Sequence, residues 1–431
     1  MKLALQNGWV VDPANDIDGR HDIFIDNGRI TAMGTPPKDF VADREIDVNG
    51  LHVMPGIIDL SARLREPGEE YIATIASETV AAASGGITRM VYPPDTYPVI
   101  DTPAMARMIQ DRADSIGSTK VHPLGALTVG LDGDKLTDMA MLMDAGCIGV
   151  SNASRPIQNT LVMRRAMQYA STYDLTVFLT PKDFWLAGNG CVHEGETSTR
   201  LGLPAIPEAA ETVGVARDLA LIETSGARAH FDLISCRRSL EMIDEAQQRG
   251  LPVTVGTSIH QLHLCEQDIK AFDTRYKVMP PLRTEHDREA LVQGVAQGKI
   301  TVICSDHQPH SVDAKLAPFS EAATGIAGLD SLLALTLRLV KSGKITLGCA
   351  ISALTTNPAK VIGLDAGHLG IGAPADLCIY DPSHEWVLDE QSMVSRGRNS
   401  PFMNSTLTGK VLYTINGGKV VYNSLTNQTK P

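Results

Sequence analysis

Residues 73–84, ATIASETVAAAS, and residues 86–93, GITRMVYP, decide the fold of this chain. The first segment is rich in alanine and has the composition of a helix. The second is a short apolar run closed by two prolines, which is typical of a buried strand. A helix followed directly by a buried strand predicts the repeating unit of an α/β protein.

The same pattern recurs through the middle of the chain. Helix-like or strand-like runs stand at NTLVMRRAMQYAS (159–171), DLTVFLTP (174–181), ARAHFDLIS (227–235), LPVTVGTS (251–258) and KITVICSDH (299–307). Repetition on this scale favours a closed (β/α)8 barrel over an open sheet, and we assign the barrel to residues 54–365. Chemistry in such barrels lies at the carboxyl ends of the strands, so candidate site residues are sought there.

Both ends of the chain carry a different pattern. Strand-like runs alternate with turn signals in residues 1–53, and the same style returns in residues 366–431. Asn-Gly pairs at 7–8, 27–28 and 49–50 stand between apolar runs, which is a strong hairpin signal. We therefore predict a small β-sandwich domain assembled from both termini.

Composition narrows the class of protein. The 431 residues are 43% hydrophobic and 20% charged, as in a globular protein, and the formal net charge of −12 disfavours nucleic acid and anionic membranes as partners. No secretory signal pattern and no apolar run of about 18 residues occurs, so we expect a cytoplasmic protein. Seven cysteines are scattered singly, without a CxxC pair, and predict buried free thiols.

Several strand ends resemble those of the dihydroorotase family within the amidohydrolase superfamily. MPGIID (54–59) with LREPG (64–68) resembles that family's first-strand signature PGxIDxHxHLREPG. Further matches are YPPDT (92–96), KVMPPLR (277–283) and SDHQPH (305–310). The resemblance spans nearly the whole chain and implies the same barrel with an accessory β domain.

The resemblance also implies a metal site, because dihydroorotases hydrolyse a cyclic amide with a metal-bound hydroxide. Zinc lowers the pKa of its water from about 15.7 to about 7, which supplies this nucleophile at neutral pH. In this chain the matching ligand positions carry residues that are unsuited to zinc: Ser61, Arg63, Ala153, Thr180 and Leu233. No lysine stands in residues 150–154 that could be carbamylated, as it is in hydantoinases. We therefore expect no zinc cofactor.

Only part of the remaining site matches the family. Asp306 occupies the position of the proton-transferring carboxylate, and Arg65 and His310 match positions that hold the substrate carboxylate. Asp95 and Met279 replace two asparagines.

Arg63 stands where the metal charge is lost. We predict that it serves as the counter-ion of Asp306 and its neighbour Asp59, because buried carboxylates are costly unless they are paired. A residual anion site around Arg63, Arg65, Lys182 and His310 is a second hypothesis. A rebuilt metal cluster from His260, His263, His307 and His310 is a third.

Two functions follow from this comparison. The first is a non-catalytic dihydroorotase-like protein that assembles with the catalytic chain of aspartate transcarbamoylase, for which the resemblance implies six copies of each chain. The alternative is an active cyclic amide hydrolase with a rebuilt site, in which Asp306 is the general base and the arginine and lysine group stabilises the oxyanion.

Overall fold

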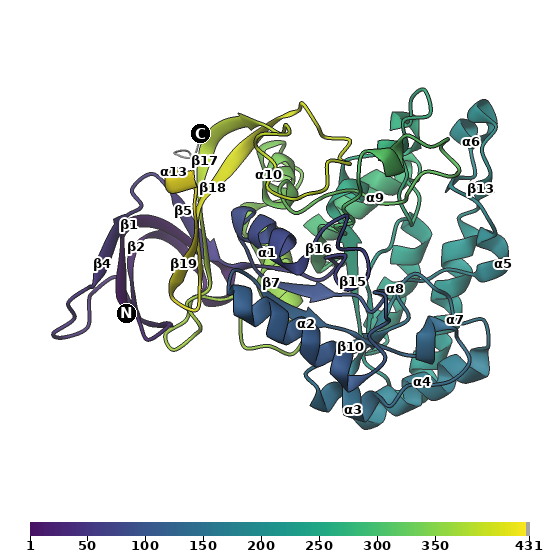
Figure 1. Ribbon diagram of the computed structural model, residues 1–431, viewed down its shortest axis with the longest axis horizontal. Helices are drawn as coiled ribbons and strands as arrows, with labels where there is room; N and C mark the ends of the chain where they lie inside the picture. Colours follow the sequence, from purple (N-terminus) through teal and green to yellow (C-terminus); the bar gives the residue numbers. More distant parts are fainter. Residues whose placement is uncertain (428–431) are drawn as a thin grey trace.

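The computed structural model describes residues 1–427 as a barrel beside a layered sheet (Figure 1). Residues 428–431, the end of the segment predicted to join the β domain, lie outside the described residues. The barrel strands are β6 (Ile57–Asp59), β7 (Ile87–Tyr92), β8 (Lys120–Pro123) with β9 (Gly125–Ala126), β10 (Gly149–Ser151), β11 (Thr176–Leu179), β14 (Ala229–Phe231), β15 (Val253–Ser258) and β16 (Val302–Cys304). All neighbouring pairs are parallel, as the sequence predicts.

The barrel closes between its first and last strands. Just beyond their ends, the His307 N–H donates to the Ser61 carbonyl at 3.1 Å, and the Arg63 N–H donates to the His307 carbonyl at 2.9 Å. Closure therefore sets the two predicted site segments, Ser61–Arg63 and Asp306–His307, side by side.

Helices follow each barrel strand on the outside. They are α1 (Ile75–Ser84), α2 (Pro103–Ile116), α3 (Met139–Asp144), α4 (Thr160–Thr172), α7 (Ala209–Ser225), α8 (Arg237–Gln248), α9 (Glu285–Ala296) and the group α10 (Leu332–Lys341), α11 (Leu347–Leu354) and α12 (Thr356–Val361). The predicted helix at 73–84 is α1, which begins at Ile75 after its N-cap Thr74, whose hydroxyl accepts the N–H of Ser77 in a capping box. The predicted strand at 86–93 is β7. A short excursion between β11 and α7 holds β12 (Val192–His193), β13 (Ala205–Ile206), α5 (Phe184–Ala187) and α6 (Glu196–Leu201).

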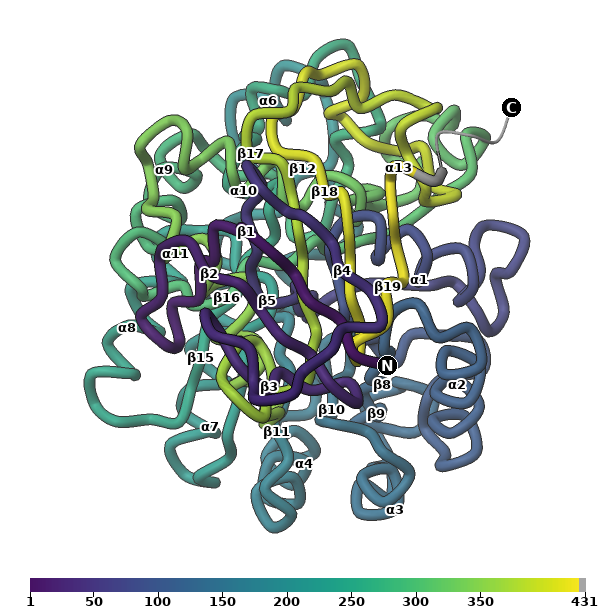
Figure 2. The backbone as a smooth tube through the Cα atoms, turned by 90° about the vertical axis from the view of Figure 1, so that its left-hand side faces the viewer, coloured from purple at the N-terminus to yellow at the C-terminus, as the bar shows by residue number. Residues whose placement is uncertain are grey.

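Beside the barrel lies an eight-stranded sheet built from both ends of the chain. Its strands are β1 (Lys2–Asp12), β2 (Ile17–Asp26), β3 (Arg29–Met33), β4 (Arg44–Asp47), β5 (His52–Pro55), β17 (Leu377–Val387), β18 (Thr406–Asn416) and β19 (Lys419–Asn423). β17 pairs with β5, so amino-terminal and carboxyl-terminal strands lie next to one another (Figure 2). Along its length β1 pairs first with β4 and then with β5.

The three Asn-Gly pairs have different outcomes. Asn27-Gly28 forms the turn between β2 and β3, as predicted. Asn7-Gly8 lies within β1 at a register shift, so the hairpin prediction is wrong there and the pair makes a bulge instead. Asn49-Gly50 turns the chain from β4 to β5, which both run parallel to β1, and that hairpin prediction is wrong as well. A left-handed residue permits a bulge as readily as a hairpin, and the pairing partner decides between them.

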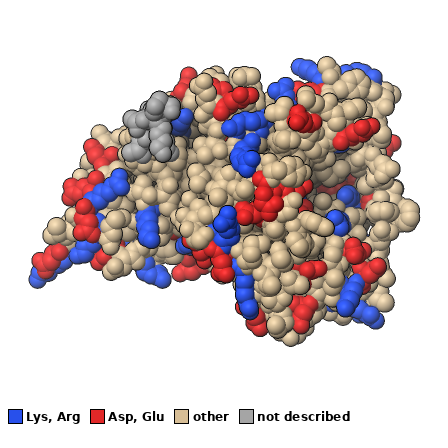
Figure 3. Space-filling model, in the orientation of Figure 1, with Lys and Arg blue, Asp and Glu red and all other residues tan. Residues whose placement is uncertain are grey.

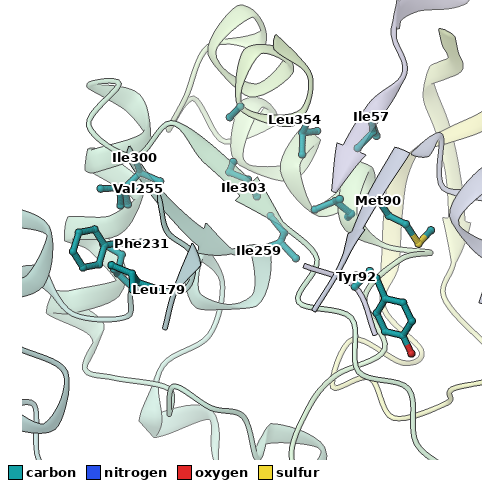
Figure 4. Close-up of a cluster of buried hydrophobic side chains, with 14 of the residues drawn as sticks. Ile57, Met90, Tyr92, Leu179, Phe231, Val255, Ile259, Ile300, Ile303 and Leu354 are labelled. Carbon is teal, nitrogen blue, oxygen red and sulfur yellow. The ribbon is translucent and has the colours of Figure 1, made fainter. Parts of the chain in front are cut away.

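The barrel interior is a continuous apolar cluster (Figure 4). Its members include Ile57, Tyr92, Phe231, Ile259 and Ile303, each at most 2% exposed. A separate cluster fills the β domain. At the junction, Arg89 of β7 donates to Asp376 at 3.1 and 2.7 Å, and both residues are buried.

Other sequence expectations fit this picture. Six of the seven cysteines are buried and Cys349 is half-buried, and all seven are free thiols. Within residues 1–427, no helix is long and apolar enough to cross a membrane. Basic and acidic side chains are interspersed on the face drawn in Figure 3.

Candidate functional site

The candidate site is a cavity of about 270 Å³ at the carboxyl ends of the barrel strands. Its walls carry most of the residues that the sequence singled out: Arg63, Arg65, Asp95, Ala153, Thr180, Leu233, Met279 and His310. Segments that follow seven barrel strands thus converge as predicted. Three residues of these segments, Arg65, Ala153 and Asp306, have φ of 65°, 49° and 43°. Left-handed backbone at non-glycine residues is costly and is concentrated at sites of function.

Arg63 is the central cation of this cavity. Its Nη1 donates to Asp306 Oδ1 at 3.3 Å and its Nε donates to Asp95 Oδ2 at 2.9 Å. The side chains of Arg63 and Asp306 are 11% and 1% exposed. The predicted pairing of Arg63 with Asp306 is confirmed.

Asp59 is held differently from the prediction. Its carboxylate accepts the backbone N–H of Ser61 and both the N–H and the hydroxyl of Ser305. It has no hydrogen bond to Arg63, so the prediction that Arg63 pairs with Asp59 is wrong. Asp59 is the last residue of β6. The Ser305 hydroxyl and the backbone N–H groups of Ser61 and Ser305 satisfy its carboxylate oxygens without a cation.

Charge and burial shape the titration of this cluster. Burial raises the pKa of Asp306 to about 6, although Arg63 acts to lower it. Burial alone would lower the pKa of Arg63, but the nearby carboxylates of Asp95 and Asp306 outweigh burial and raise it. The guanidinium is therefore permanently charged and compensates two acids at once.

Asp232 is a site residue that sequence reasoning missed. It lies just beyond β14, lines the cavity, and is 7% exposed. Burial, with a further contribution from Asp306, raises its pKa to about 8. A signal was present in the sequence, because Asp232 stands two residues after His230 and alternate strand residues share a face.

The five replaced ligand positions do not fit a zinc ion. The Ser61 hydroxyl is buried without a hydrogen-bond partner, and Ala153 and Leu233 bring no donor atom. Arg63 adds a fixed positive charge within the same cluster. Among residues 1–427, no group of three or more His, Cys, Asp or Glu side chains is arranged to hold a metal.

The substrate-matching residues are occupied by contacts within the chain. Arg65 donates through Nε to the Pro309 carbonyl at 3.0 Å and through Nη1 to Glu69 at 3.0 Å. Its Nη2 lies 3.0 Å from His310 Nε2. Burial, followed by the charge of Arg65, lowers the pKa of His310 to about 3, so this histidine is neutral. The structure thus places Arg65 next to His310, and the carboxylate that pairs with Arg65 is that of Glu69.

The four histidines proposed as a rebuilt metal cluster are dispersed. His307 contacts Glu78 at 2.9 Å, and His263 contacts the Leu335 carbonyl at 2.9 Å. His260 contacts the Ser258 hydroxyl at 2.9 Å. The cluster hypothesis is wrong for these residues, because each imidazole completes a different local packing contact.

Lys182 stands apart from Arg63 and Arg65. It lines a notch whose wall shares Ser154, Thr180 and Met279 with the main cavity. Burial lowers the pKa of Lys182. The second hypothesis placed Lys182 in one anion site with Arg63, Arg65 and His310. The structure puts those three residues in the main cavity and Lys182 in the adjoining notch.

The chain combines a closed (β/α)8 barrel, buried carboxylates at the strand ends, and a β-sheet built from both termini. This combination is that of an amidohydrolase scaffold. The Dihydro-orotase-like family model matches residues 50–239, and the Amidohydrolase family model matches residues 270–422. A dihydroorotase-like protein of Pseudomonas aeruginosa is 44% identical, over 98% of this chain and 100% of that protein. A dihydroorotase of Syntrophotalea carbinolica is 42% identical, over 98% of this chain and 99% of that protein. This chain belongs to the dihydroorotase family.

Solved structures confirm the fold. The L-hydantoinase (dihydropyrimidinase) of Arthrobacter aurescens superposes with a TM-score of 0.88 at 22% identity, covering 98% of this chain and 96% of that one. The dihydropyrimidinase of Brevibacillus agri has a TM-score of 0.85 at 20% identity, covering 98% and 95%. At these identities the likeness concerns the architecture alone.

Proposed function

We propose that this chain is a dihydroorotase-like protein of pyrimidine biosynthesis that does not hydrolyse dihydroorotate and instead serves as a structural partner of the aspartate transcarbamoylase catalytic chain. The ion-paired guanidinium of Arg63 carries the proposal. It lies between Asp95 and Asp306, where the family's mechanism requires a metal-bound hydroxide.

A guanidinium cannot replace the metal in that reaction. It has no lone pair for a ligand bond and no proton that it gives up at neutral pH, so it supplies no activated water. One of its two carboxylate bonds also occupies Asp306, the residue that the family uses for proton transfer. The chain thus lacks a nucleophile, while its scaffold is complete.

The retained scaffold supports a role in assembly. The relative from Pseudomonas aeruginosa, named only as dihydroorotase-like, aligns from end to end with this chain. The barrel and the sheet remain, as expected when shape is needed and chemistry is not. By resemblance, the assembly would contain six copies of each chain.

An active hydrolase is the competing function. Relatives named dihydroorotase in Syntrophotalea carbinolica and Geobacter metallireducens are 42% and 40% identical. Asp232 and Asp306 are both buried carboxyl groups with raised pKa values, and such groups act as bases in other enzymes. In this chain, however, Asp306 is held by Arg63, and the described residues form no His, Cys, Asp and Glu cluster that could hold a water-activating metal.

Three measurements on one preparation separate these functions. Protein purified without chelator is analysed for metals and assayed for dihydroorotate hydrolysis beside a metal-dependent dihydroorotase. It is then mixed with the aspartate transcarbamoylase catalytic chain of the same genome and run on a sizing column. We expect less than about 0.1 zinc per chain, no turnover, and a complex that elutes ahead of both components.

Other outcomes contradict the proposal in distinguishable ways. Stoichiometric zinc with turnover would establish the hydrolase. Absence of both metal and turnover, together with separate elution of the two chains, would refute the assembly role alone.

A further inference from the structure

The floor of the cavity carries hydrogen-bond acceptors that nothing in the described chain satisfies. Asp232 Oδ1 and Asp95 Oδ1 are buried and without a hydrogen-bond partner, and both residues line the cavity. Native proteins rarely leave buried polar atoms unpaired, because an unpaired buried group keeps the full penalty of losing its water. Unsatisfied acceptors in a cavity wall therefore indicate a ligand that donates hydrogen bonds.

The local cation does not meet this need. Arg63 directs Nε to the other oxygen of Asp95 and Nη1 to Asp306, and forms no hydrogen bond with Asp232. Two carboxylates already share this one guanidinium. An additional positive group at the floor is thus electrostatically favourable.

The opposite wall has the complementary character. Ser154 and Thr180 line the cavity, and no hydrogen bond engages their hydroxyls within residues 1–427. Lys182 shares the adjoining notch with both of them, and its ammonium has no carboxylate partner in the described chain. A mostly buried cation without a partner is costly, so this wall favours an anion.

The rim arginine does not compete for that anion. Two nitrogens of the Arg65 guanidinium donate to Pro309 and Glu69, and the third lies 3.0 Å from His310 Nε2. Glu69 supplies the carboxylate there. The Ser154 and Thr180 hydroxyls of the cavity and the Lys182 ammonium of the adjoining notch are therefore left as donors.

We propose that the cavity binds a free α-amino acid, with its ammonium on Asp232 and Asp95 and its carboxylate on Ser154, Thr180 and Lys182. An ammonium offers three N–H donors, whereas a bare metal would need a ligand cluster that the described residues do not form. The cavity of about 270 Å³ is below the usual range for drug-sized ligands and suits a molecule of this size. The site does not depend on whether the chain assembles with another protein.

Binding is tested on the full-length wild-type chain with the twenty L-amino acids by ligand-observed NMR, followed by calorimetry on the tightest binder. The amine without its carboxylate and the acid without its amino group serve as matched analogues. We expect each analogue to bind at least tenfold more weakly than the amino acid. Failure of all twenty amino acids to bind, or equal binding by the deaminated acid, would overturn the proposal.

Substitutions locate the site. Asp232→Asn keeps the shape and removes the carboxyl group at the floor, and Lys182→Met removes the charge at the wall. Each should weaken the amino acid at least tenfold, whereas Lys360→Met, at an exposed position of α12, should leave its affinity unchanged. Melting curves verify that the variants are folded, and unchanged affinity in both site variants would refute the assignment.

Discussion

Substitution of Arg63 by methionine should destabilise the protein strongly and in a pH-dependent manner. The guanidinium lies 2.9 Å from Asp95 and 3.3 Å from Asp306. At an effective dielectric constant of about 20, each pair gains roughly 5 kcal/mol of attraction, which desolvation of the charges partly offsets. Removal of one partner from a buried pair costs about 3–5 kcal/mol, and we expect this loss at pH 8.

The loss should shrink at low pH. Burial already raises the pKa of Asp306 to about 6, and loss of the Arg63 charge raises it further. At pH 5 the Asp306 carboxyl is therefore protonated in the variant and no longer requires a counter-ion. We expect the destabilisation at pH 5 to be about half of that at pH 8.

Urea unfolding followed by tryptophan fluorescence at both pH values measures the effect. The double variant Arg63→Met with Asp306→Asn should recover part of the loss at pH 8, since it removes the buried Asp306 charge and leaves only Asp95, whose side chain is 21% exposed, without its cation. Arg238→Met is the matched control, because Arg238 pairs with Glu241 on the surface and should cost about 0–1 kcal/mol. A loss below about 1 kcal/mol at pH 8, or no recovery in the double variant, would refute the counter-ion role.

Three further predictions concern other buried groups. Because the folded-state pKa of Asp232, about 8, lies above its ordinary 3.8, the folded protein retains a proton that the unfolded chain releases, and stability falls as pH rises from about 4 to 8. Asp232→Asn should flatten this slope in melting curves; an unaltered slope would contradict the assignment. Arg89→Met should cost about 3 kcal/mol in urea unfolding by stranding Asp376 at the junction, and a cost below about 1 kcal/mol would show that the pair is dispensable. Gly86→Ala should cost about 1–3 kcal/mol, since Gly86 has φ +84° and an added Cβ would stand 2.4 Å from Cys378 Sγ; unchanged stability would mean that the backbone there relaxes freely.

The loss of the family's metal ligands was readable from the sequence because each ligand occupies one position in an ordered motif. Arg63 and Asp306 could be paired in advance, since a new cation at the metal's place demands an anion. The bond from Arg63 to Asp95 was not predicted. In the sequence Asp95 stands out only as a replacement for a family asparagine, and only the structure shows that it also compensates Arg63.

Asp232 and Glu69 illustrate what motifs leave out. Neither stands at a position for which the family's signature suggested a role, yet one forms the cavity floor and the other pairs with Arg65. Their importance arises from burial and from distances between strands, which depend on how the barrel closes. The Asn7-Gly8 error has the same origin, because the local turn preference was real but β2 and β5 had already determined the path of β1.

The sequence by itself determined the repeated α/β units, the two-ended β domain, the family and the replacement of the metal ligands. These properties reside in local periodicity and in residue identity at marked positions. Only the tertiary structure decided which carboxylates share Arg63, that Glu69 accompanies Arg65, and which buried oxygens and cations remain unpaired. Those outcomes depend on contacts of a few ångströms between segments that lie up to about 240 residues apart, and electrostatic energies change steeply over such distances.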